Sequence, residues 1–164
     1  MIYFNYFESP LGSIRLLSDG EAIIGLYLEG QPLGKAFIGS PLVERQLPVF
    51  QEAGQWLREY FSGSEPSFLP RLSLRGTEFQ RQVWALLQNI PYGSIITYGE
   101  LARQVAALRG VGAMSAQAVG GAVGRNPISI MVPCHRVVGS RGQLTGYAGG
   151  LEKKAYLLKL EGMA

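Results

Sequence analysis

The stretch ITYGELARQVAALRGVGAMSAQAVGGAVG (residues 96–124) decides the fold of the second half of this chain. Thr97 and Glu100 have the S/T-x-x-E spacing of a capping box, which predicts a helix that runs to about Ala106. A glycine-containing turn follows, and residues 114–124 are expected to form a second short helix. Two helices joined by such a turn have the outline of a helix-turn-helix.

The second of these helices has very little side-chain bulk. Gly120 and Gly121 each cost about 1 kcal/mol relative to alanine inside a helix, and most of their neighbours are alanine or glycine. The backbone of such a helix can be approached closely, either by another helix of the same protein or by the groove of a nucleic-acid duplex.

Charge is distributed unevenly along the chain. Residues 1–70 hold 4 basic and 8 acidic side chains, a formal charge of −4, whereas residues 71–164 hold 11 basic and 4 acidic side chains, a formal charge of +7. A basic half joined to an acidic half suggests that the basic half binds a polyanion. An ordinary solvated surface is the alternative, but with the helix-turn-helix outline we favour a duplex groove.

The first half of the chain has the pattern of a small α/β domain. Three β-prone runs separated by glycine-containing turns predict a meander of strands over residues 2–28. Residues 42–61 switch to helical spacing. The loop that follows is the expected domain junction, which divides the chain into an N-terminal α/β support domain (residues 1–70) and a second domain (residues 71–164).

Composition excludes several classes of protein. At 164 residues and 47% hydrophobic, the chain can bury one good core or two small ones. No apolar run approaches the roughly 20 residues of a membrane span, and the N-terminus lacks the basic region of a secretory signal. One cysteine and one histidine provide neither a disulfide nor a four-ligand zinc site. We therefore expect a cytoplasmic protein without metal or cofactor.

The only cysteine and the only histidine are adjacent, in the sequence PCHRV. The preceding run ISIMV (residues 128–132) predicts a buried strand that ends at Pro133, which would place Cys134 at the edge of a pocket. An inert buried thiol is the alternative, and the neighbouring His135 and Arg136 argue against it. Because adjacent side chains diverge, we expect His135 to act on Cys134 through a water molecule.

The C-terminal run GGLEKKAYLLKLEG supplies a candidate acid for His135. It predicts a helix whose apolar face holds Leu151, Ala155, Leu157 and Leu158. Glu161 projects from the same face, in the last turn, where the helix dipole disfavours an anion. It either frays into water at the chain end or orients His135.

Together these segments resemble the O6-alkylguanine-DNA alkyltransferases, the methylated-DNA–protein-cysteine methyltransferases. The resemblance covers roughly residues 74–162 and rests on RGTEFQRQVWALLQNIPYG, ITYGELA, GRNPISIMV, PCHRV and GYAGG. It implies an RNase H-like N-terminal α/β domain followed by a helical domain that carries a helix-turn-helix (winged-helix-like) and the active-site cysteine.

The resemblance also implies the function, which is DNA repair. An alkyl group would pass irreversibly from O6-alkylguanine in double-stranded DNA to Cys134, once per protein molecule, after minor-groove binding and base flipping. The implied partner is the damaged duplex. No cofactor, metal, membrane or obligate protein partner is expected, and the protein would be a monomer.

Site residues follow from the same resemblance. Cys134 would be the nucleophile, His135 the base acting through water, and Glu161 its orienting acid. Asn126 would tie the recognition helix to the active-site strand. The implied substrate-binding residues are Tyr98, Tyr147, Ala148 and Val137. The implied DNA-binding residues are Gln117, Ala116, Ala118, Gly120, Gly121 and Arg125.

One position departs from the family pattern. Three residues before GGA, where the family has an arginine that fills the space left by the flipped nucleotide, this chain has Gln117. A glutamine can hydrogen-bond to the orphaned base, but it brings neither the positive charge nor the stacking plane of arginine. We expect slower or weaker base flipping and little change in the chemistry on free modified guanine.

Other functions remain as alternatives. A non-catalytic alkyl-damage sensor resembles this chain with its cysteine replaced, so Cys134 argues against it. A Cys-His-Glu hydrolase acting on an acyl substrate would not need a helix that enters a groove. The third alternative is a helix-turn-helix regulator whose cysteine is a sensor. Transfer of a methyl group from methylated DNA to Cys134 would indicate repair, and binding alone would indicate a sensor or regulator.

Overall fold

A computed structural model describes residues 1–163 of the chain. The chain separates into two compact units. The first unit contains Met1–Arg75 together with Pro127–Ser129, and the second contains Gly76–Asn126 and the chain from Ile130 onward. The first unit therefore extends beyond residue 70 and includes three residues from the second half of the sequence.

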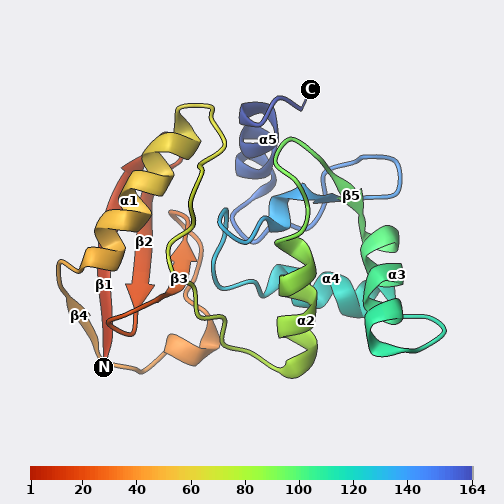
Figure 1. The fold of residues 1–164 in the computed structure, drawn as a ribbon, viewed down its shortest axis with the longest axis horizontal. Helices are drawn as coiled ribbons and strands as arrows, with labels where there is room; N and C mark the ends of the chain where they lie inside the picture. Colours follow the sequence, from red (N-terminus) through yellow and green to blue (C-terminus); the bar gives the residue numbers. More distant parts are fainter. Residues whose placement is uncertain (164) are drawn as a thin grey trace. The chain divides into compact units, whose positions relative to one another are not determined.

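The first unit is built on a four-stranded sheet with the strand order β3-β2-β1-β4 (Figure 1). Its strands are β1 (Ile2–Ser9), β2 (Gly12–Ser18), β3 (Ile23–Tyr27) and β4 (Leu42–Glu44). The first three form the expected antiparallel meander, and the short β4 pairs with β1 in parallel. A 3₁₀ turn over Lys35–Phe37 lies in the connection between β3 and β4.

Helix α1 (Pro48–Phe61) is shorter than the helical pattern of residues 42–61 predicted. Residues 42–44 form β4 instead, so the prediction was wrong at this end. Pro48 occupies the first turn of the helix, where its fixed φ is favourable and its missing N–H is not needed. Side chains of α1 such as Phe50 and Leu57 are buried in the core of the unit.

The prediction of a buried strand over ISIMV (residues 128–132) is wrong as well. Only Ile128 forms a bridge, with Leu26 of the edge strand β3, and the chain then turns. The amide of Leu26 donates to the carbonyl of Pro127 (2.9 Å), and its carbonyl accepts from the amide of Ser129 (3.2 Å). Ile130 has a φ of 71°, a left-handed conformation that a β-branched residue rarely adopts. Burial explains the apolar pattern here, although no strand forms.

The second unit consists mainly of helices around a two-stranded parallel sheet (Figure 1). The helices are α2 (Glu78–Leu87), α3 (Tyr98–Arg109), α4 (Ala116–Gly124) and α5 (Leu151–Leu160), and the strands are β5 (Ile96–Thr97) and β6 (Val137–Val138). Helices α3 and α4 form the predicted helix-turn-helix, so this part of the fold is confirmed.

Local capping explains the boundaries of α3 and α4. Thr97 Oγ1 accepts a hydrogen bond from the amide of Glu100 (3.0 Å), as the capping box predicts. Helix α3 continues to Arg109, beyond the expected end at Ala106, because the left-handed residue that stops it is Gly110, with a φ of 68°. Ser115 caps α4 by accepting from the amide of Ala118 (3.2 Å).

Helix α4 is anchored to α2 through a buried tryptophan. The indole Nε1–H of Trp84 donates to the carbonyl of Ala122 at 2.8 Å. Val119 and Val123 point into the same core and are almost completely buried. This attachment leaves the N-terminal residues of α4 exposed. Throughout residues 1–163, no helix is both long enough and apolar enough to cross a lipid bilayer.

Candidate active site

Cys134 lies in a tight turn that its own backbone closes. Pro133 introduces a 3₁₀ turn over Cys134–Arg136, in which the amide of Cys134 donates to Val132 (2.8 Å) and that of Arg136 donates to Pro133 (3.0 Å). Cys134 is 6% exposed and His135 is fully buried. The cysteine therefore sits within a turn, with little contact with solvent.

Asn126 connects the end of α4 to this turn. It follows Arg125, the residue that caps α4, and its Nδ2 donates to the carbonyl of Val132 at 2.7 Å. Its side chain also forms a hydrogen bond that favours the thiolate of Cys134. The side chain thus joins the end of α4 to the segment before Cys134, which is a turn rather than the predicted strand.

Opposing effects act on the thiol. Burial raises the pKa of Cys134, because a thiolate is poorly solvated in an apolar environment. The hydrogen bond from Asn126 and the positive charge of Lys154 both lower the same pKa. With burial as the largest effect, the thiol needs a base to become a nucleophile at neutral pH.

His135 and Glu161 form a short, buried contact. Nε2 of His135 lies 2.6 Å from Oε2 of Glu161, and both side chains are completely buried. Because the carboxylate is the acceptor, Nε2 carries the proton and Nδ1 holds the lone pair of the neutral ring. Glu161 follows the last residue of α5, and its Oε1 also accepts from the amide of Gly93 (3.2 Å). Fraying of Glu161 into water is thereby excluded.

Arg136 shares the same carboxylate. Its Nε donates to Oε1 of Glu161 at 2.8 Å and its Nη2 donates to Oε2 at 3.1 Å. The remaining end of the guanidinium, Nη1, donates to the carbonyl of Ile90 at 2.8 Å, and the group lies 5.6 Å from the ring centroid of Tyr92. Glu161 is consequently a fully satisfied buried anion whose charge Arg136 balances.

These neighbours determine the protonation of His135. Burial has the largest effect and lowers the pKa of His135, and the nearby charges of Arg136 and Lys154 lower it further. The hydrogen bond to Glu161 and the charge of that carboxylate raise it. Because the net direction is downward, the ring is neutral at pH 7 and its Nδ1 can accept a proton.

The inward face of α5 differs from the predicted one. Leu151 and Ala155 are exposed, so the prediction was wrong for these two residues. The buried positions are Lys154, Leu157, Leu158 and Glu161. The spacing of these four residues is helical, but a pattern search that counts only apolar side chains assigns a lysine to the solvent. Lys154 is the residue near the site that sequence reasoning missed.

A pocket of about 390 Å³ opens beside Tyr98. It is lined by Tyr98, Ala116, Gly120, Gly124, Thr145, Gly146 and Ala148. The hydroxyl of Tyr98 donates to the carbonyl of Thr145 at 3.2 Å. A side chain at Gly146 would lie 3.2 Å from that hydroxyl, and φ there is +63°, so this position requires glycine.

The pocket unites some of the predicted residues and not others. Tyr98 and Ala148, predicted to bind substrate, line it together with Ala116 and Gly120, predicted to bind DNA. Tyr147 and Val137 are buried and are not among the lining residues. The remaining predicted DNA-binding residues of α4 and its C-terminus lie outside the lining, either exposed or half-buried: Gln117, Ala118, Gly121 and Arg125.

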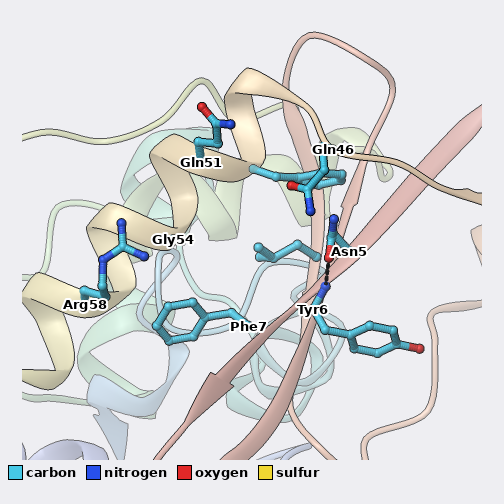
Figure 2. A pocket seen from close by; sticks show the side chains of 9 residues that line it. Asn5, Tyr6, Phe7, Gln46, Gln51, Gly54 and Arg58 are labelled. Atoms are coloured by element: carbon cyan, nitrogen blue, oxygen red, sulfur yellow. Dashed lines mark hydrogen bonds between the residues drawn. The ribbon is translucent and has the colours of Figure 1, made fainter.

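The first unit has a pocket of its own, between β1 and α1. Figure 2 shows Asn5, Tyr6 and Phe7 on one side and Gln51, Gly54 and Arg58 on the other. Its volume is about 240 Å³, and the amide of Tyr6 donates to Oδ1 of Asn5 within it (2.8 Å). None of its lining residues is a cysteine, histidine or carboxylate. The groups suited to nucleophilic chemistry therefore lie in the second unit.

Comparison with known proteins identifies relatives of both halves. Residues 78–163 match the family model of the 6-O-methylguanine DNA methyltransferase DNA binding domain, and residues 2–74 match that of the ribonuclease-like domain. The methylated-DNA–protein-cysteine methyltransferase of Methanosarcina acetivorans is 47% identical over 163 residues, which cover 98% of this chain and 99% of that protein. The protein of the same name from Haemophilus influenzae is 43% identical over 98% of this chain and 86% of its own length.

A solved structure of a relative agrees in fold. The crystal structure of Mycobacterium tuberculosis OGT in complex with DNA superposes with a TM-score of 0.84 at 40% sequence identity, and the match covers 97% of this chain and 92% of that one. Two family models cover most of the chain between them, and the relatives match it along almost their entire length. The chain belongs to the 6-O-methylguanine DNA methyltransferase family.

Proposed function

We propose that this protein repairs DNA by transferring an alkyl group, such as methyl, from O6 of guanine to Sγ of its own Cys134. The observation that carries the proposal is the buried thiol beside the His135–Glu161 pair, in the unit that also holds the helix-turn-helix. The names of the full-length relatives support the same activity.

The proposed chemistry is a displacement at carbon. His135 takes the thiol proton through a water molecule, and Glu161 stabilises the positive charge that forms on the ring. The thiolate of Cys134 attacks the alkyl carbon, an S–C bond forms, and the C–O bond to guanine breaks. The leaving guanine takes a proton, for which the hydroxyl of Tyr98 is the proposed donor. Because the thioether is stable, each protein molecule reacts once.

The proposed substrate is double-stranded DNA. Helix α4 presents Ala116, Gln117 and Ala118 to solvent, and its glycines leave room for a minor groove. The lesion would rotate out of the duplex, at a cost of a few kcal/mol, into the pocket beside Tyr98. Arg125 at the end of α4 is exposed and can pair with a backbone phosphate.

The two halves of the chain have different proposed roles. Residues 71–164 carry both DNA binding and chemistry in this proposal, since every group assigned to the reaction or to DNA lies there. Residues 1–70 support that domain. We place the protein in the cytoplasm, where a reducing environment keeps a single reactive thiol available.

Intact-mass measurement tests the proposal. The protein is incubated with a duplex that contains one O6-methylguanine, and the Cys134→Ala variant is the control. Repair predicts one methyl group per protein molecule in the wild type and none in the variant. Binding without a mass change would instead indicate a sensor or regulator, and turnover without modification of the protein would indicate a hydrolase.

A further inference from the structure

Lys154 is a buried cation that the proposed reaction has not used. It lies in the first turn of α5, three residues after Leu151, and its side chain has no exposed surface. Lysine is almost never fully buried unless its ammonium group has partners. Exposed Lys159, on the same helix, is an ordinary solvated lysine and a natural point of comparison.

The ammonium of Lys154 joins two segments near the thiol. Nζ donates to the carbonyl of Val137 at 2.5 Å and to that of Thr145 at 2.8 Å. Val137 directly follows the turn that carries Cys134. Thr145 belongs to the loop that lines the pocket, and its carbonyl also accepts the hydroxyl of Tyr98. One side chain thus connects α5, the active-site turn and the pocket loop.

The same ammonium acts on the ionisable groups around it. Burial lowers the pKa of Lys154 to about 8, and the charge of Cys134 opposes this shift. In return, the positive charge of Lys154 lowers the pKa of Cys134 and that of His135, both of which lie in the active-site turn. Nζ also lies 5.8 Å from the ring centroid of Tyr98, which faces it from α3.

Donation to the two carbonyls does not by itself require a charge. A neutral amine would make the same two hydrogen bonds without the cost of keeping an ammonium group away from water. The cation is kept where a negative charge develops, on a sulfur that is buried and otherwise difficult to ionise. At neutral pH, below its pKa of about 8, the ammonium is mostly protonated, and a positive charge already in place stabilises the thiolate without reorganisation.

We propose that Lys154 is a positioning residue for alkyl transfer, whose ammonium clamps the Cys134 turn to the Thr145–Gly146 loop and favours the thiolate over the thiol. For its effect on the reaction the inference rests on the proposed function. Its effect on the ionisation of Cys134 is independent of any substrate.

The first test is a thiol titration. Thiolate absorbance in the ultraviolet is followed against pH in the wild type, Lys154→Met and Lys159→Met, with Cys134→Ser as the blank. We expect Lys154→Met to raise the pKa of the thiol by about one unit, a tenfold smaller thiolate fraction at neutral pH, and Lys159→Met to leave it unchanged. A folded Lys154→Met variant with the wild-type titration would overturn the proposal.

The second test follows methyl transfer from an O6-methylguanine duplex by intact mass across the same pH range. We expect Lys154→Met to react about tenfold more slowly at neutral pH and to approach the wild-type rate where the thiol is fully ionised. An equal loss at every pH would indicate a structural role and contradict the inference. If the wild type itself takes no methyl group, the proposed function fails, whereas the thiol titration still decides the inference.

A third measurement does not depend on the folding of Lys154→Met. The NMR signal of the Lys154 13Cε is titrated in the wild type and in Cys134→Ser. Since coupled groups sense each other's ionisation, the wild-type signal should show a step at the pKa of the thiol, and the variant should lack it. The same titration curve in both proteins would contradict the inference.

Discussion

Glu161 connects the active-site turn to the rest of the second unit through its carboxylate. Its carboxylate accepts from His135, from two nitrogens of Arg136 and from the amide of Gly93. The helix dipole disfavours an anion at the end of α5, and these donors stabilise it there. The same contacts fix the orientation of the His135 ring. The positive charge of Arg136 also offsets the negative charge of Glu161, which by itself would raise the pKa of His135.

The buried histidine predicts a loss of stability in acid. Burial lowers the pKa of His135 below its ordinary value of 6.5, so between these two values the unfolded chain binds a proton that the native protein does not. The stability contributed by the neutral ring is complete above pH 6.5 and is lost as pH falls through the lowered pKa. We expect the urea midpoint to fall more steeply below pH 6.5 in the wild type than in His135→Gln. Equal slopes would contradict this account.

Arg136 is expected to be essential for the folded state. Arg136→Met leaves the buried Glu161 without its main counter-charge and the carbonyl of Ile90 without its donor. Breaking a buried pair in this way costs about 3–5 kcal/mol of unfolding free energy. Urea unfolding followed by tryptophan fluorescence measures the change. Exposed Arg141→Met is the control, with an expected change below about 0.5 kcal/mol; similar losses in both variants would be the contrary result.

Among the helices, α4 combines low intrinsic stability with an open surface. Gly120 and Gly121 weaken it, and Trp84 and the buried valines hold it in place. Its exposed N-terminal turn carries Gln117, the residue that departs from the family pattern. The capping box at Thr97 made the preceding helix, α3, predictable, because a cap is a local interaction between residues three apart.

Gln117→Arg should accelerate repair of duplex DNA. An arginine adds a charge and a planar group that can stack in the space left by the flipped base, and base stacking contributes about 1–3 kcal/mol. The lower value corresponds to an increase of about fivefold in the rate of methyl transfer from the duplex. Free O6-methylguanine base, which needs no flipping, should react at an unchanged rate, and Gln117→Lys should show a smaller gain. An unchanged duplex rate in Gln117→Arg would refute this reading.

Across the whole molecule, sequence reasoning recovered what local patterns and a specific motif can encode. The strand meander, the helix-turn-helix and the contact between His135 and Glu161 follow from such signals. The edge strand at residues 42–44 and the turn at Ile130 do not, because pairing with distant strands determines both. Lys154 was missed for a related reason: its partners are carbonyl groups, which carry no sequence signature.

The central claim is that the protein consumes itself by alkylating Cys134. Its most direct test uses an excess of O6-methylguanine duplex, a count of the guanines restored per protein molecule, and tandem mass spectrometry of the tryptic peptide Asn126–Arg136. The account predicts that repair stops at one lesion per molecule, with the methyl group on Cys134. Continued turnover, or a methyl group on any other residue, would contradict it.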